Sequence, residues 1–244
     1  MDTLSPSNLL SIWERGLAQP PVERALTMLA AALPEVPPDT LAQLTIGQRN
    51  AYLLALREQM LGSRLTGVVV CPHCGEQLEL DLSMADLRPT SAGEPAEIFT
   101  ADTDRYHVQF RLPNSLDLVA IRNSATVEAA RQRLLSRLAL RIERDGEEIS
   151  LEHLPENVVA TLAERLSQAD PQADTRLALD CPACRHEWLA ALDIAAFLWS
   201  ELHAWASRIL RDVHLLAATY GWREADILAL STARREFYLE MVRG

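Results

Sequence analysis

The 244-residue sequence contains no lysine, so all 23 of its basic residues are arginine. Without lysine, the chain can form neither a P-loop that grips nucleotide phosphates nor a Schiff base with a carbonyl substrate. The sequence also lacks the G-x-S-x-G elbow of hydrolases and the G-x-G-x-x-G turn of dinucleotide-binding proteins. These motifs therefore give no candidate catalytic or organic-cofactor-binding residues.

Long hydrophobic runs are also absent. Glu, Arg or Gln interrupts every apolar stretch before it reaches 18 residues, so we expect no membrane span. The N-terminal segment lacks a basic start, and Glu14 and Arg15 interrupt its best apolar stretch. This pattern is not that of a secretory signal. We expect a cytoplasmic protein, in which cysteines stay reduced.

Positive charge is scarce as well, because 34 acidic residues give the chain a formal net charge of −11. Residues 63–196 alone carry 13 arginines against 22 acidic side chains. Contacts to phosphate groups need a basic surface, so we expect no nucleic-acid partner. Hydrophobic residues make up 48% of the chain, which is ordinary for a globular protein and excludes wholesale disorder.

The few cysteines are concentrated in two C-P-x-C pairs. The four residues are Cys71, Cys74, Cys181 and Cys184. Two thiolates separated by two residues can bind one tetrahedral Zn²⁺ from a tight turn, and two such knuckles complete a closed four-sulfur site. Gly75 suits the turn after the first pair, whereas Arg185 takes that place in the second. We predict that these cysteines bind one structural Zn²⁺ that has no open position for catalysis.

Other interpretations of the pairs remain open. The same four sulfurs could bind iron, form two disulfides, act as a thioredoxin-type redox pair or remain inert thiols. Redox pairs of that type usually open a helix in a βαβ unit, and neither pair is placed in that way. His73 and His186 lie beside the knuckles and are alternative ligands. The metal content of the purified protein would separate these possibilities.

The two knuckles belong to a weak internal repeat, in which CPHC-GEQLELDL matches CPAC-RHEWLAALDI and each copy reads strand, knuckle, strand, then helix. We expect an α+β fold that is mostly helical. A split Cys₄ zinc ribbon would be interrupted by an inserted α/β segment and flanked by helical N- and C-terminal regions. The predicted segments are 1–62 (N-terminal helical region), 63–96 (first zinc-knuckle half), 97–172 (inserted α/β segment), 173–196 (second zinc-knuckle half) and 197–244 (C-terminal helical region).

Local signals place several elements within these segments. Thr45 and Gln48 form a capping box for a helix that Gly62 would end. Residues 89–95 read as a turn-rich linker, and Asp145-Gly146 predicts the turn of a hairpin over residues 141–149. Apolar residues spaced three or four apart over 198–220 predict a long helix. This stripe is expected either to pack on the chain's own core or to bind a partner.

Several stretches together carry a resemblance to a known family. They are LTIGQRNAYLLALREQMLG, VVVCPHCGEQLELDL, FRLPNSLDLVAI, CPACRHEWLAALDIAAFLWSEL and LLAATYGWREADILALSTARREFYLEMV. In this order they are similar to the T-even-phage-type baseplate hub assembly family, found in contractile phage tails and contractile injection systems. The resemblance covers roughly residues 41–244 and leaves the first 40 residues uncovered. Arg49, Arg111 and Asp117 match its pattern without an assigned role.

The resemblance implies a non-enzymatic baseplate assembly or structural protein that contacts other baseplate or hub proteins. Such a protein would be made in the cytoplasm and could become part of a phage-tail-like particle. Its oligomeric state stays open. The alternative function is a zinc-ribbon protein that binds nucleic acid or has a regulatory role, and a third is a redox or hydrolytic enzyme.

Overall fold

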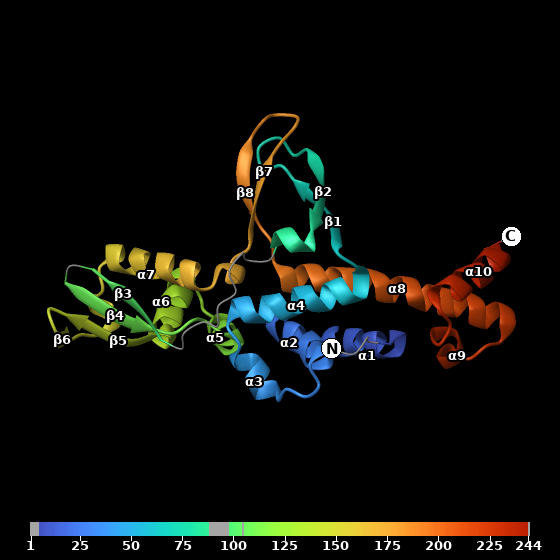
Figure 1. Cartoon of the computed structure of the whole chain (residues 1–244), viewed down its shortest axis with the longest axis horizontal. Coiled ribbons are helices and arrows are strands. Elements are labelled where there is room, and N and C mark those ends of the chain that lie inside the picture. Colours follow the sequence, from blue (N-terminus) through green and yellow to red (C-terminus); the bar gives the residue numbers. More distant parts are fainter. Residues whose placement is uncertain (1–4, 88–97, 104, 244) are drawn as a thin grey trace. The chain divides into compact units, whose positions relative to one another are not determined.

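The computed structural model confirms a mostly helical chain with small antiparallel sheets (Figure 1). The residues that it describes are 5–87, 98–103 and 105–243. The predicted linker at 89–95 and the predicted boundary between residues 96 and 97 lie outside these described residues. The chain divides into two compact units, one built from Met1–Pro34 and Ala195–Gly244 and the other from Glu35–Ile194.

The first unit is helical, and a long helix provides most of its core. Its helices are α1 (Pro6–Gly16), α2 (Pro21–Ala32), α8 (Ile194–Tyr220), α9 (Glu224–Leu228) and α10 (Thr232–Arg243). Ile209, Val213 and Leu216 of the predicted α8 stripe are buried together with Leu10 of α1 and Leu239 of α10. This part of the stripe therefore packs on the unit's own core. None of the helices in the described part of the chain is long and apolar enough to cross a membrane.

The second unit begins with α3 (Pro38–Gln43) and α4 (Ile46–Leu61). The predicted capping box opens α4, because Gln48 N donates to Thr45 Oγ1 at 3.1 Å and Thr45 N donates to Gln48 Oε1 at 2.9 Å. Gly62 ends the helix, as predicted, with a φ of 87°. The buried Arg57 then donates from Nη1 to the carbonyl oxygens of Gly62 and Arg64, at 2.7 and 2.6 Å. These bonds attach the end of α4 to the strand that follows.

Two antiparallel hairpins carry the cysteine pairs at their turns. They consist of β1 (Arg64–Val70) with β2 (Gln77–Ser83), and of β7 (Arg176–Asp180) with β8 (Glu187–Ala191). The short 3₁₀ helix η1 (Met84–Leu87) follows the first hairpin in the sequence, and η3 (Pro171–Ala173) precedes the second. The predicted order of strand, knuckle and strand is therefore confirmed in both copies of the repeat.

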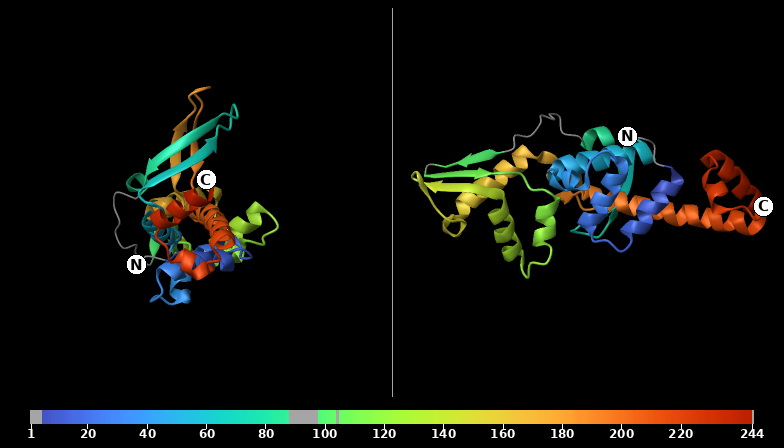
Figure 2. Two further views of the ribbon diagram at one scale, coloured as in Figure 1. Left: turned by 90° about the vertical axis from the view of Figure 1, so that its right-hand side faces the viewer. Right: turned by 90° about the horizontal axis from the view of Figure 1, so that it is seen from below.

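The segment between the hairpins forms a small α/β layer. Its elements are β3 (Phe99–Asp102), β4 (Tyr106–Phe110), α5 (Ser115–Ile121), α6 (Val127–Leu138), β5 (Ala139–Arg144), β6 (Glu147–Glu148), η2 (Leu151–His153) and α7 (Glu156–Ala169). The strands pair in chain order, and the predicted hairpin at Asp145 and Gly146 joins the last two. Helix α7 lies along the sheet (Figure 2) and buries Val158 and Leu162 against Phe110.

Candidate metal centre

The first knuckle is a tight turn that the backbone holds closed. Cys71 N donates to Glu76 O at 2.8 Å, and Gly75 N donates back to Cys71 O at 3.0 Å. Gly75 has a φ of 78°, in the left-handed region that glycine enters without a steric cost. Cys71 is buried, whereas Cys74 is exposed. The turn thus directs two thiols to one point at the tip of the hairpin.

The second knuckle repeats this geometry bond for bond. Cys181 N donates to His186 O at 2.9 Å, and Arg185 N donates to Cys181 O at 2.7 Å. Cys181 is buried and Cys184 is half-buried, which is the same order as in the first knuckle. Arg185 adopts a φ of 59°, although it has a β-carbon that disfavours this conformation. The two knuckles therefore share the same backbone turn, although the residue with positive φ is glycine in the first and arginine in the second.

Replacing Arg185 by glycine is expected to stabilise the protein. Left-handed backbone costs a residue with a β-carbon about 1–2 kcal/mol, and the extra entropy of glycine in the unfolded chain offsets part of that gain. We expect a net increase of up to about 1 kcal/mol in the free energy of unfolding, measured by urea titration. Gly75→Ala is the matched variant and should change stability in the opposite direction. Equal effects of the two variants would contradict this account.

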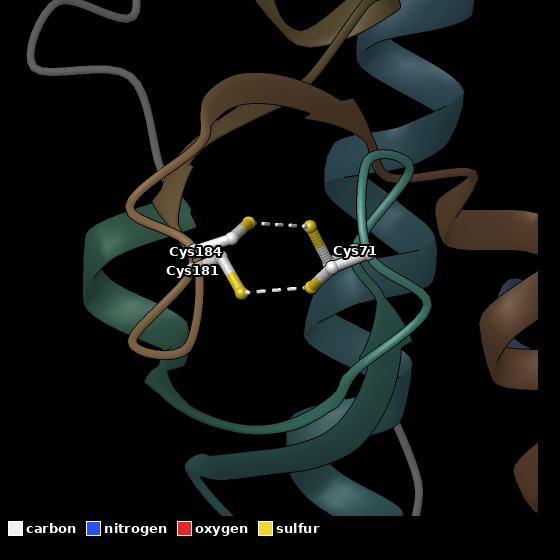
Figure 3. A group of neighbouring side chains, drawn as sticks. Cys71, Cys181 and Cys184 are labelled. Atoms are coloured by element: carbon white, nitrogen blue, oxygen red, sulfur yellow. Dashed lines mark hydrogen bonds between the residues drawn. The ribbon is translucent and has the colours of Figure 1, made fainter.

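The two knuckles bring the four predicted cysteines together. Figure 3 shows Cys181 and Cys184 facing Cys71 across the gap between the hairpins. Sγ of Cys71 lies 3.7 Å from that of Cys184, and Sγ of Cys74 lies 3.6 Å from that of Cys181. All four sulfurs lie within 4.8 Å of one another, and all four cysteines are free. The group could hold a metal ion.

The thiols affect one another's protonation strongly. Burial raises the pKa of Cys71, but hydrogen bonds from the backbone of Cys74 and His73 and contacts with neighbouring thiols lower it to about 7. For Cys74, the backbone hydrogen bond from Glu76 acts to lower the pKa, yet the contact with Cys184, burial and the other thiols raise it to about 12. One thiolate therefore forms readily, whereas further negative charge in the cluster needs a cation to balance it.

The two histidines beside the knuckles form a stack of their own. The imidazole rings of His73 and His186 lie 5.3 Å apart between centroids, and His186 also stacks on Trp188 at 6.0 Å. Among the described residues, the group of ligand atoms within 4.8 Å consists of the four cysteine sulfurs. The arrangement favours the cysteines over the histidines as the ligand set.

Buried hydrogen bonds join the start of α4 to residues 170–172, which precede the second hairpin in the sequence. The buried Asp170 accepts a hydrogen bond at 2.8 Å from the backbone of Gly47, a residue 123 positions earlier in the sequence. Asn50, also buried, donates from Nδ2 to Gln172 O at 2.9 Å. The carboxylate of Asp170 lies at the N-terminus of α4, where the helix dipole favours negative charge. Sequence analysis gave neither Asp170 nor Gln172 a role.

Replacing Gly47 by alanine is expected to break this junction. An ideal β-carbon at Gly47 would lie 1.6 Å from Asp170 Oδ1, so the carboxylate would have to leave its backbone donor. We expect a loss of about 1–3 kcal/mol in the free energy of unfolding, despite the higher helix propensity of alanine. The control is a double-mutant cycle with Asp170→Ala. If Gly47→Ala costs as much in the Asp170→Ala background as in the native chain, the clash is not the cause.

Two residues that sequence analysis left without a role, Arg111 and Asp117, belong to an ion cluster around a buried carboxylate. Asp117 is fully buried and accepts hydrogen bonds from both terminal nitrogens of Arg111, at 2.6 and 2.8 Å, and from Arg137 Nε at 2.7 Å. It also accepts from Asn114 N at 3.0 Å, within a capping box that opens α5.

Arg49 is the other residue that matched the family pattern without an assigned role. It is buried and donates to the side chain of its neighbour Asn50. Burial lowers the pKa of Arg49, and Asp193 opposes that shift.

Comparison with known proteins gives one family. A family model described as T4 bacteriophage base plate protein matches residues 23–199, which is more than half of the chain. The motif resemblance covered roughly residues 41–244. The family match begins earlier, at residue 23, and does not include residues 200–244. No curated protein and no solved structure matches the chain.

Proposed function

Because the chain belongs to the T4 bacteriophage base plate protein family, we propose that it is a non-enzymatic assembly or structural protein of a baseplate. The particle would be a contractile phage tail or a related contractile injection system. The observation that carries this proposal is the family match over residues 23–199, which contains both cysteine pairs and the α/β layer between them. The protein would be made in the cytoplasm and act there or within the particle.

We also propose that the four cysteines bind one structural Zn²⁺ in a split zinc ribbon. Bonds of about 2.3 Å in tetrahedral geometry separate neighbouring sulfurs by roughly 3.8 Å. The contacts of 3.7 and 3.6 Å between the knuckles come close to this separation. Four cysteine ligands fill the coordination shell, so the metal would hold the hairpins together and would not activate water. Iron in the same cage remains the competing identity for the ion.

Protein partners fit the charge of this region better than nucleic acid does. Residues 63–196 carry 13 arginines against 22 acidic side chains, and four thiolates around one Zn²⁺ would add further negative charge. A duplex would be repelled by such a surface. Other baseplate or hub proteins are therefore the partners that we propose, with contacts made by the helical regions while the metal secures the middle of the chain.

The experiment that tests this function removes the gene from its own host or phage. We expect particles that lack a complete baseplate, seen by negative-stain electron microscopy, and rescue by the native gene in trans. The tagged protein should also co-purify with hub, spike or wedge proteins of its gene cluster. Complete, contractile particles formed in the absence of the gene would contradict the proposal. Salt-dependent DNA binding at physiological ionic strength would support the nucleic-acid alternative instead.

A further inference from the structure

Strand β7 of the second hairpin (orange in Figure 1) has an open backbone edge. In an antiparallel pair, residues that exchange backbone hydrogen bonds alternate with residues that do not. Near the turn, Cys181 N donates to His186 O at 2.9 Å, and at the base Leu192 N donates to Thr175 O at 2.9 Å. The residues between these positions that direct their backbone N–H and C=O groups away from β8 are Arg176, Ala178 and Asp180. Within the described part of the chain β7 pairs with β8 alone, so its outer edge can accept another strand.

The side chains at this edge are exposed, and those at its two ends carry opposite charges. Arg176, Ala178 and Asp180 are all exposed, whereas the residues between them are half-buried. In a second copy of β7 that runs antiparallel beside the first, with Ala178 opposite Ala178, Arg176 of each copy lies opposite Asp180 of the other. Residues with outward backbone groups then face one another, so the hydrogen bonds and the two ion pairs form in the same register.

This match of a strand with itself distinguishes β7 from the other hairpin strands. By the same alternation, the charged residue on the edge of β1 is Arg64, and those on the edge of β2 are Glu79 and Asp81. On the edge of β8 it is Glu187. A second copy of β2 would therefore place like charges opposite one another, which is destabilising. Of the four hairpin strands, all of which the structure describes, β7 is the one whose edge carries both signs of charge.

An exposed apolar side chain continues the same surface. Leu189 of β8 lies opposite Ala178 in the hairpin, on the same face of the sheet, and is 61% exposed. In the paired arrangement, Leu189 and Ala178 of one copy lie in line with Ala178 and Leu189 of the other. This apolar row runs between the two ion pairs, and its burial adds hydrophobic stabilisation to the backbone hydrogen bonds.

The antiparallel arrangement also brings the knuckle of each copy to the base of the other copy's hairpin. In this register Pro182 lies opposite Asp174. A pocket of about 680 Å³ opens at the base, and its charged lining residues are Asp86, Glu164, Asp174 and Arg176. The knuckle carries the exposed Arg185. The tip of a second copy therefore meets open space and an excess of opposite charge.

We propose that β7 is a self-association surface, through which two copies of this chain form a two-fold symmetric dimer with one continuous four-stranded sheet in the order β8-β7-β7-β8. Such an interface uses the same residues on both copies, as the pairing of Arg176 with Asp180 does. The contact is small, so the association is reversible, with a dissociation constant of roughly 1–100 µM. The inference rests on the second unit alone and is independent of the baseplate function.

The test is sedimentation equilibrium of the full chain at about 1–300 µM, with a reducing agent present to exclude disulfide-linked dimers. The mass of the native protein should rise from 27.2 kDa towards twice that value. Arg176→Asp and Asp180→Arg each place like charges opposite one another, so each variant alone should associate at least about tenfold more weakly. An equimolar mixture of the two variants restores both ion pairs and should associate as tightly as the native chain.

Proline variants test the backbone hydrogen bonds separately. Ala178→Pro removes an outward N–H group that β8 does not use, so the hairpin should still form while the dimer is lost. Ala191→Pro places the same ring at an outward position of β8 and should leave the dimer intact. The proposal is overturned if the native chain stays at 27.2 kDa throughout, or if the mixture of charge variants remains monomeric. Association of Ala178→Pro as tight as that of the native chain would overturn it as well.

Discussion

Replacing Cys181 by serine is expected to abolish binding of the proposed structural Zn²⁺ and to separate the two hairpins. Cys181 is fully buried, and its sulfur lies 3.6 Å from that of Cys74 on the other hairpin. Structural zinc contributes about 10–16 kcal/mol of binding free energy in zinc-finger peptides, and that energy becomes folding energy. We expect the zinc content, measured by plasma mass spectrometry, to fall from about one ion per chain to nearly none. The hairpins should become sensitive to proteolysis at the same time.

The control lies within the same knuckle. Ala183 is an exposed residue between the two cysteines, so Ala183→Ser introduces the same hydroxyl group and should leave the zinc content unchanged. Removing the ion from the native protein with a strong chelator should reproduce the effect of Cys181→Ser. A native protein purified without metal and stable in the chelator would contradict a structural role for zinc. A coloured protein with one iron per chain would identify the competing metal.

The second large effect is expected from replacing Asp117 by asparagine. The variant keeps the shape of the side chain but presents an amide where Arg111 and Arg137 need a carboxylate. Breaking a buried ion pair usually costs 3–5 kcal/mol. The arginines are 28% and 38% exposed, which lets water screen part of the loss. We therefore expect a loss of about 3 kcal/mol, or roughly 6–12 °C in the unfolding temperature.

An exposed ion pair supplies the control. Asp174 pairs with Arg176, and both side chains are more than half exposed, so Asp174→Asn should cost no more than about 1 kcal/mol. Comparable losses in the two variants would show that burial of Asp117 is not what makes its ion cluster important.

The cluster around Asp117 also predicts a pH dependence. Burial raises the pKa of Asp117, but the hydrogen bonds from Arg111, Asn114 and Arg137 outweigh it and lower the pKa below its usual value. A lowered folded-state pKa stabilises the protein above the unfolded-state value of about 3.9. That contribution is lost as the pH falls through the folded-state pKa. The difference in stability between the native protein and Asp117→Asn should therefore be constant near neutral pH and shrink in strong acid, as measured by urea titration.

The features that sequence could predict depend on local signals. The capping box at Thr45 and the turn at Asp145 and Gly146 are each encoded within four residues, and both are confirmed. The cysteine cluster was predictable because all four cysteines occur in two pairs of identical spacing. Asn114 and Asp117 carry the same kind of capping signal as Thr45 and Gln48, so α5 could have been found in the same way.

The features that sequence missed depend on distant partners. Arg137 reaches Asp117 across 20 residues, and Asp170 reaches Gly47 across 123. No local spacing encodes such contacts, because the packing of several elements brings the residues together. The short strand β3 was missed for a related reason, since its pairing with β4 provides the hydrogen bonds that a four-residue strand needs.

The split between the knuckles has a consequence during synthesis. Cys74 meets Cys181, which lies 107 residues later. At 5–20 residues per second, the first pair of thiols would wait roughly 5–20 s for the second to leave the ribosome. Gly47 at the start of α4 waits even longer for Asp170. The nascent chain therefore exposes two cysteines and an incomplete helix junction for seconds, a period in which oxidation or capture of an incorrect metal competes with folding.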